Sequence, residues 1–213
     1  MQVEQQVQVK PTLSDMMRIW FKGVLDPVAG FLNRLGLMPN TVTLIGLAGT
    51  SVGGVLLAQG RLLPGALLIF VMAPVDALDG TMARLRGERS DFGAFVDSVT
   101  DRYSELLTYG ALAFYYASIG ETLGLLLAYA AAAGAVLVSY VRAKAEGLGF
   151  EARGGVLTRF ERYLILGPSL LIGAWFPVVT LVGLGVIAVL ANLTALQRIL
   201  GVRRQARQQK GLR

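Results

Sequence analysis

Residues 76–101 read DALDGTMARLRGERSDFGAFVDSVTD and hold four aspartates between long apolar runs. The four acids are Asp76, Asp79, Asp97 and Asp101. At about 100° per residue, the first two share one helix face, and the last two, one turn apart, share another. A short turn around Gly87 can bring the two faces together. The pattern therefore predicts two helices with their acidic faces opposite each other.

Charge-free runs flank this acidic segment on both sides. They cover residues 41–59, 62–75, 106–120, 122–141 and 163–197. A membrane-spanning helix needs about 20 apolar residues, so the last run is too long for one span. Trp175-Phe176-Pro177 interrupts that run, which predicts two helices joined by an aromatic hairpin. The sequence thus predicts an all-α polytopic membrane protein with six transmembrane helices.

The composition agrees with a membrane protein and limits the chemistry. Among 213 residues, 54% are hydrophobic and 16% are charged, and there is no Cys and no His. Disulfides, thiolate nucleophiles and zinc sites of the Cys type are thereby excluded, as is the usual His general base. Any metal should be a hard cation bound by carboxylates.

The basic residues indicate the topology. The net charge is +6, and 19 of the 20 Lys and Arg residues fall on one side of the predicted spans, with Arg61 alone on the other. By the positive-inside rule, both termini and the aspartates lie on the cytoplasmic side of the cell membrane. The cations between Arg203 and Arg213 predict contact with anionic lipid rather than with nucleic acid.

The segment before the first span has its own pattern. Residues 13–35 carry apolar side chains at helical spacing, which predicts an amphipathic helix in the membrane interface, broken or bent at Asp26-Pro27. We expect one membrane domain over residues 1–213. It divides into an interfacial segment 1–38, a six-helix core 39–198 and a basic cytoplasmic tail 199–213.

The aspartates call for a counter-charge. On the scale measured for membrane insertion, each ionised carboxylate at mid-depth costs about 2.5–3.5 kcal/mol. Cationic side chains within these two predicted helices are few, and His is absent. One or two Mg²⁺ or Mn²⁺ ions are therefore the expected partners.

Small and basic residues complete a longer pattern around the acids. It runs Asp76-x-x-Asp79-Gly80-x-x-Ala83-Arg84, eight residues, then Gly93-x-x-x-Asp97-x-x-x-Asp101. The small residues leave space where a ligand can approach, and Arg84 supplies a cation suited to a phosphate oxygen. In every fixed position the pattern resembles the signature of the CDP-alcohol phosphatidyltransferase family. Pro39-Asn40-x-x-Thr43 is similar to the family's other nucleotide-contacting segment.

The resemblance implies an enzyme that displaces CMP from a CDP-linked lipid such as CDP-diacylglycerol. It implies that Asp76, Asp79 and Asp97 are ligands of two Mg²⁺ or Mn²⁺ ions. Asp101 would be both ligand and general base toward an acceptor hydroxyl. The residues implied to contact the CDP-lipid are Asn40, Thr41, Val42, Thr43, Gly80, Ala83, Arg84, Ser90 and Gly93. Relatives also suggest a homodimer.

A later group of cations suits either lipid headgroups at the span ends or an acceptor that carries a phosphate. Arg142, Lys144, Arg159 and Arg162 stand near the ends of two predicted spans on the side of the aspartates. The arrangement resembles the phosphatidylinositol phosphate synthases of the family, which implies transfer to inositol 1-phosphate. Arg142 precedes Lys144 here, where the subgroup has the reverse order, which keeps the charge but alters the fork geometry.

Three alternatives stay open. Glycerol 3-phosphate, a second phosphorylated polyol, would give phosphatidylglycerol phosphate, and the basic residues alone cannot separate the two acceptors. The donor could carry ether-linked chains rather than acyl chains. In another class, intramembrane aspartates could serve a cation transporter, although no inverted-repeat pattern is visible.

Overall fold

The computed structural model describes residues 13–88, 90–152 and 154–211, and this part of the chain holds seven α-helices and no β-strand. They are α1 (Leu13–Arg34), α2 (Pro39–Ala58), α3 (Leu62–Arg86), α4 (Asp91–Ser118), α5 (Thr122–Glu146), α6 (Arg159–Gly173) and α7 (Pro177–Gly211). The expectation of an all-α protein is confirmed for these residues.

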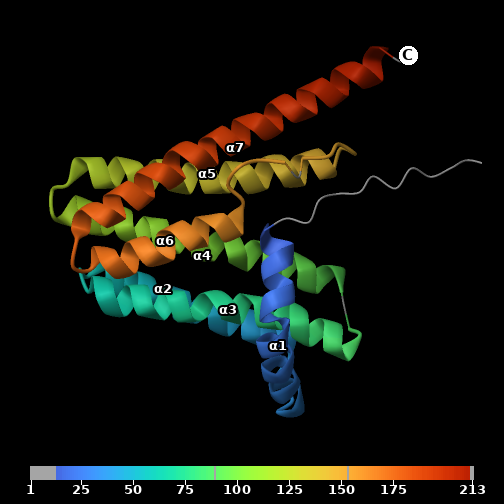
Figure 1. Ribbon diagram of the computed structural model, residues 1–213, viewed down its shortest axis with the longest axis horizontal. Coiled ribbons are helices and arrows are strands. Elements are labelled where there is room, and N and C mark those ends of the chain that lie inside the picture. Colours follow the sequence, from blue (N-terminus) through green and yellow to red (C-terminus); the bar gives the residue numbers. More distant parts are fainter. Residues whose placement is uncertain (1–12, 89, 153, 212–213) are drawn as a thin grey trace, which may run out of the picture.

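Helices α2 to α7 run up and down along a common direction, with their connections at the two ends of a bundle (Figure 1). α1 crosses this direction near one end and packs against α3. The extensive contacts are those of α2 with α3 and α4, of α5 with α4 and α7, and of α6 with α7 and α3. The α3–α4 and α5–α6 connections and the end of α7 lie at the same end as α1.

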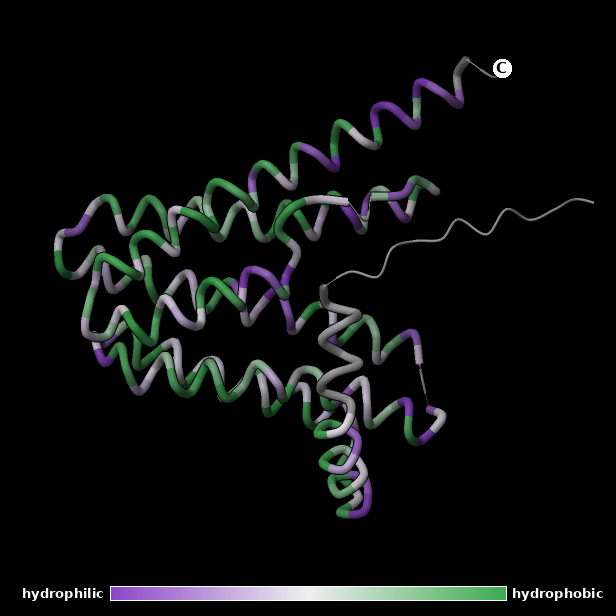
Figure 2. Tube along the Cα trace, viewed as in Figure 1, coloured by the Kyte–Doolittle hydropathy of each residue, from purple (hydrophilic) through white to green (hydrophobic). Residues whose placement is uncertain are grey.

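Four of the described helices are long and apolar enough to cross a membrane. They are α2, α3, α5 and α7, the last over Pro177–Gln209. The first half of α4 carries charged side chains, and α6 has 15 residues, or about 22 Å at 1.5 Å per residue, against a hydrocarbon core of about 30 Å. Apolar residues dominate most of the bundle's length, and polar residues gather toward one end (Figure 2).

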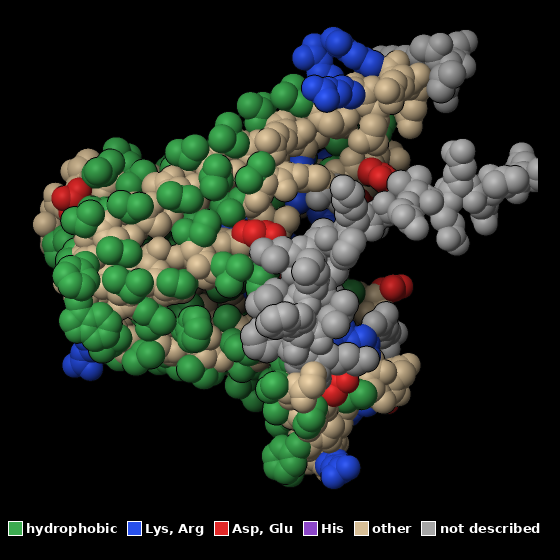
Figure 3. All heavy atoms as spheres, in the orientation of Figure 1, with side chains coloured by type: hydrophobic (Ala, Val, Ile, Leu, Met, Phe, Trp, Pro, Cys, Tyr) green, Lys and Arg blue, Asp and Glu red, His purple; other side chains and the backbone are tan. Residues whose placement is uncertain are grey.

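Apolar side chains cover much of the face of the bundle that Figure 3 shows. Phe70, Phe114 and Tyr129 are among many that are more than half exposed. The interior combines leucines and tyrosines with small residues such as the fully buried Ala128 and Ala131, which let α5 and α7 approach closely. An apolar exterior suits a bundle surrounded by lipid.

The helix boundaries refine several expectations. Residues 163–197 do form parts of two helices, with Trp175 and Phe176 exposed in the turn between α6 and α7. α1 continues through Pro27 without a break. α7 stays helical to Gly211 and so includes most of the predicted basic tail. Helices extend beyond the charge-free runs since a charged side chain near a span end can reach the interface without ending the helix.

Candidate active site

A short turn around Gly87 connects the two acidic helices, α3 and α4. Gly87 has φ +69°, a left-handed conformation that favours glycine, and its N–H donates to the Arg84 carbonyl at 3.2 Å. The N–H of Glu88 donates to the Ala83 carbonyl at 3.1 Å, which completes the C-terminal cap of α3. Ser90 then caps α4 by accepting from the Gly93 N–H at 3.0 Å. The two predicted helices and the turn between them are confirmed, whereas the extensive contacts of α4 are with α2 and α5 rather than with α3.

Asp79 joins α3 to the start of α2. Its carboxylate is 5% exposed and accepts hydrogen bonds from the Thr43 hydroxyl and from the Gly80 N–H. Thr43 is also buried, and its hydroxyl oxygen lies 3.2 Å from the carbonyl oxygen of Pro39. Two segments that the sequence analysis assigned to the donor site thus meet at one buried carboxylate, 36 positions apart in the chain.

Gly93 brings the first turn of α4 against the first turn of α2. A Cβ at this position would lie 3.1 Å from Ser90 Oγ and 3.6 Å from Asn40 Oδ1. The glycine therefore keeps open a narrow polar space beside Asn40. Asn40, Ser90 and Gly93 are three of the predicted donor-contacting residues, and the structure places them together.

The other residues predicted to contact the CDP-lipid have different surroundings from one another. Arg84 is exposed and donates from Nη2 to Thr81 Oγ1 at 2.6 Å, with its Nη1 3.6 Å from where a Cβ of Gly80 would stand. Ala83 is half-buried and Thr41 is exposed. Val42 is buried in a small apolar cluster with Ala29, Leu78 and Met82, so its side chain supports the packing of α1.

A polar clasp fixes α1 and the start of α2 to the end of α3. Arg86 donates from Nε to Asn33 Oδ1 and from Nη2 to the Leu37 carbonyl, each at 2.7 Å. Asn33 in turn donates from Nδ2 to the Met82 carbonyl at 3.2 Å. Leu37 stands three residues before Asn40, so the clasp fixes the approach to the donor segment. The sequence analysis did not identify this role for Arg86.

We expect Arg86→Gln to destabilise the fold near α1. Hydrogen bonds from a charged group contribute about 1.5–3 kcal/mol each, and the variant loses most of that from two bonds. A thermal unfolding scan in detergent should show a lower midpoint, and limited proteolysis should cut earlier near α1. Glu88→Gln is the matched control, because Glu88 is exposed and lies 3.8 Å from Arg86. Equal midpoints for the two variants would contradict the clasp.

Asp101 faces α6 rather than solvent. Its carboxylate is 7% exposed, with Oδ1 2.5 Å from Nη1 of Arg159 and Oδ2 3.2 Å from Nη1 of Arg102. Arg102 is itself held by Ser139 on α5, to which its Nη2 donates at 3.0 Å. Asp97, one turn earlier on α4, is half-buried. The predicted base and one of the predicted acceptor-binding arginines are thus in direct contact.

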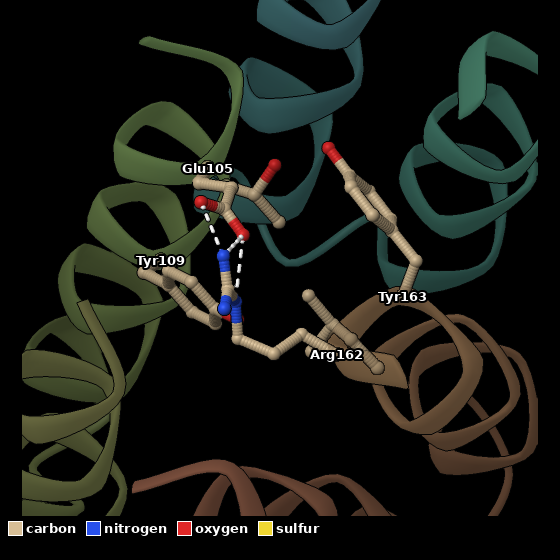
Figure 4. A pocket seen from close by; sticks show the side chains of 6 residues that line it. Glu105, Tyr109, Arg162 and Tyr163 are labelled. Atoms are coloured by element: carbon tan, nitrogen blue, oxygen red, sulfur yellow. Dashed lines mark hydrogen bonds and ion pairs between the residues drawn. The ribbon is translucent and has the colours of Figure 1, made fainter. Parts of the chain in front are cut away.

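The four predicted acceptor-binding cations have different surroundings. Arg142 is exposed and pairs with Glu146 one turn later at 2.9 Å, and Lys144 is exposed. Arg159 is 25% exposed and lies over the Tyr163 ring, 5.2 Å from its centroid. Arg162 is 1% exposed and points into the protein, where its guanidinium meets Glu105 of α4 (Figure 4). Three of the four side chains are therefore accessible to a soluble substrate in this conformation.

Two further buried charges escaped the sequence analysis. Glu105 follows Asp101 by one helical turn, at the edge of a charge-free run. Arg198, near the end of the last such run, is buried and donates to the carbonyls of Gly154 and Val138 at 2.8 and 2.7 Å. In the sequence, each of the two is an isolated charge directly beside a long apolar run. Such a charge is normally interpreted as the end of a predicted membrane span.

The donor chemistry of the site fits a hard cation. Asp79 and Asp101 offer buried carboxylate oxygens, and no His or Cys competes with them. The side chain of Asp76 lies outside the described part of the structure. Among the side chains that are described, no three acids come close enough together to form a metal site. The predicted ligand set therefore stays a prediction, which the oxygen donors support.

Comparison with known proteins agrees with this site. The family model of the CDP-alcohol phosphatidyltransferases matches residues 36–202. This chain belongs to that family. The match spans the donor segment, both acidic helices and the basic residues of α5 and α6, so the chain is a multi-pass membrane transferase.

Relatives of this phosphatidyltransferase share a product class. A phosphatidylinositol phosphate synthase of Streptomyces avermitilis is 35% identical over 92% of this chain and 85% of its own. An archaetidylinositol phosphate synthase of Methanothermobacter thermautotrophicus is 35% identical over 90% of this chain and 97% of its own.

Solved structures of the Mycobacterium tuberculosis phosphatidylinositol phosphate synthase have the same fold as this phosphatidyltransferase. One has CDP-DAG bound, and another is in complex with manganese and citrate. Each superposes with a TM-score of 0.79 at 30% identity over 84% of this chain, and over 93% and 88% of its own chain respectively.

Proposed function

We propose that this phosphatidyltransferase transfers the phosphatidyl group of CDP-diacylglycerol to a hydroxyl of inositol 1-phosphate and releases CMP. The observation that carries the proposal is the contact of Arg159 with Asp101 at 2.5 Å, which joins a partly exposed cation to the acidic site. A phosphorylated acceptor held by Arg159 would present its hydroxyl beside a carboxylate. The names of the two enzymes from Streptomyces and Methanothermobacter both specify an inositol phosphate product, and they differ in the lipid part of that product.

The chain's own residues then divide the work. Asn40, Ser90 and Gly93 border the narrow polar space, and together with Thr43 and Gly80 beside Asp79 they bind the cytidine diphosphate part of the donor. Asp76, Asp79, Asp97 and Asp101 hold divalent cations, which when bound offset the negative charge of the diphosphate. The manganese complex of the Mycobacterium tuberculosis enzyme supports a divalent ion here.

Asp101 is placed to take the proton. The acceptor oxygen forms a bond to the phosphatidyl phosphorus, the bond from that phosphorus to the CMP oxygen breaks, and the hydroxyl proton passes to Asp101. With no His in the chain, a carboxylate is the base that the composition leaves. Arg142, Lys144 and Arg159 hold the acceptor phosphate.

The membrane arrangement follows the same proposal. α4 and α6 join the four long apolar helices as fifth and sixth spans, although the first half of α4 is charged and α6 is short. By the positive-inside rule, the cations near the site support a position of the site and of both termini on the cytoplasmic side of the cell membrane. α1 lies in the interface there, and a second copy of the chain completes a homodimer.

An assay with separate substrates tests the proposal. Purified protein is incubated with Mg²⁺ or Mn²⁺, CDP-diacylglycerol or its ether-linked analogue, and either inositol 1-phosphate or glycerol 3-phosphate. We expect CMP release with inositol 1-phosphate and a lipid product whose mass is that of phosphatidylinositol phosphate. CMP release with glycerol 3-phosphate alone would make the acceptor assignment wrong. A faster reaction with the ether lipid would reassign the donor, as the Methanothermobacter relative suggests.

A further inference from the structure

The link between α4 and α6 is made by long charged side chains. α6 packs closely on α3 and α7, and α4 packs on α2 and α5. Two ion pairs bridge α4 and α6, one from Asp101 to Arg159 and one from Glu105 to Arg162. The acids are four residues apart on α4 and the arginines three apart on α6, so the pairs form two rungs of one ladder.

The pair of Glu105 and Arg162, the inner rung, is closed to solvent. Arg162 donates from Nε to Glu105 Oε1 at 2.8 Å and from Nη2 to Oε2 at 2.9 Å, a two-pronged contact (Figure 4). The two residues are 1% and 5% exposed, and Tyr109 and Tyr163 line the small pocket beside them. A planar guanidinium bound at both carboxylate oxygens fixes orientation as well as distance.

The same arginine holds the chain that leads into α6. Its Nη1 lies 3.5 Å from the Leu157 carbonyl, and the Leu157 N–H donates to Thr194 Oγ1 on α7 at 3.0 Å. Thr158 caps α6, and its N–H donates to the Glu161 carboxylate at 2.8 Å. Arg159, the first residue of α6, therefore stands between residues that are each anchored.

The outer rung is the one that a substrate can reach. Arg159 is 25% exposed, whereas Arg162 is 1% exposed and fully engaged. We propose that Glu105 and Arg162 form a positioning pair that holds Arg159 where it binds the acceptor phosphate beside Asp101. Neither member of the pair touches substrate. This inference rests on the proposed function for the identity of the bound phosphate.

The test replaces the pair without leaving a buried charge. Glu105→Leu together with Arg162→Met removes both charges and keeps similar volume, an exchange that buried ion pairs often tolerate. We expect the KM for the acceptor to rise by roughly tenfold or more, since small misplacements of a binding group have large effects. The KM for CDP-diacylglycerol should stay within about twofold.

Asn192→Ala is the control for general loosening of the bundle. Asn192 donates to the Ala130 carbonyl at 3.0 Å and to the Ala188 carbonyl at 2.7 Å, so it joins α7 to α5 without a bond to either rung. This variant should lose stability but leave both KM values within about twofold. An unchanged acceptor KM in the double variant, or a parallel rise of both KM values, would overturn the positioning role.

A conservative variant keeps the test valid if the double variant fails to fold. Glu105→Asp retains both charges but shortens the reach by one methylene, so we expect a smaller rise of the acceptor KM with the donor KM unchanged. If this variant folds and has the acceptor KM of the unmodified protein, the positioning role is wrong.

The unmodified protein separates this inference from the proposed function. If it uses glycerol 3-phosphate in place of inositol 1-phosphate, the proposed acceptor is wrong, and the same KM comparison is made with glycerol 3-phosphate. If it uses neither acceptor, the proposed function is wrong, and calorimetric titration with inorganic phosphate then tests the positioning pair. Weaker phosphate binding by the double variant would then support the positioning pair, and equal binding would overturn it.

Discussion

Asp101→Asn is expected to lower the rate of CMP release by about 10³-fold or more, because a general base alone contributes about 10²–10⁴-fold. Asparagine has nearly the shape of aspartate but cannot accept the proton of the acceptor hydroxyl. It also removes the charge that pairs with Arg159 at 2.5 Å and with Arg102 at 3.2 Å. The donor-contacting residues lie on α2, α3 and the first turn of α4, so binding of CDP-diacylglycerol should survive.

Two measurements separate these effects in the Asp101 variant. CMP release under saturating substrates gives the loss of rate, and calorimetric titration with CDP-diacylglycerol gives the retained binding. Asp91→Asn is the matched control, because Asp91 is an exposed acid at the start of the same helix and makes a helix-dipole contribution of only about 0.3–1 kcal/mol. A turnover for Asp101→Asn close to that of Asp91→Asn would remove Asp101 from the role of base.

The acidic helices could be predicted from the sequence because their signal is local. The spacing of Asp76, Asp79, Asp97 and Asp101 follows the period of one helix on each side of a glycine turn, and a period needs no tertiary information. The break before Pro177 could be predicted for the same reason. The contact of Thr43 with Asp79 could be anticipated only through the family resemblance, since 36 positions separate them.

The direction in which the Arg162 side chain points could not be predicted from the sequence. At the end of a predicted span, an arginine can turn outward to lipid or substrate or inward to a partner, and the rotation of the helix decides which. That rotation depends on how α6 packs on α3 and α7, which no local pattern contains. Its partner Glu105, 57 positions earlier, is in the sequence simply the charge that precedes an apolar run. The clasp of Arg86 with Asn33 was hidden in the same way, 53 positions apart.

Asp79→Asn is expected to remove most activity through the metal rather than through the fold. Asp79 is a 5% exposed carboxylate that accepts from the Thr43 hydroxyl and the Gly80 N–H. An asparagine oxygen can still accept from one of these, and a hydroxyl can rotate to accept from the amide, so the packing should persist. The negative charge that a divalent cation requires is lost, which is worth several kcal/mol in the transition state, or about 10²-fold or more.

Titration with Mn²⁺ measures this effect of the Asp79 variant directly. In the unmodified protein, EDTA should abolish CMP release and Mn²⁺ or Mg²⁺ should restore it. Asp79→Asn should need far more metal for half-maximal activity and should lose the rise in unfolding temperature that bound Mn²⁺ produces. Thr43→Val is the graded control, because it removes one hydrogen bond to the carboxylate but keeps its charge, and outer partners of a metal ligand contribute about 10–100-fold. If Asp79→Asn keeps the metal requirement and the thermal shift of the unmodified protein, the buried carboxylate joins α2 to α3 without binding the ion.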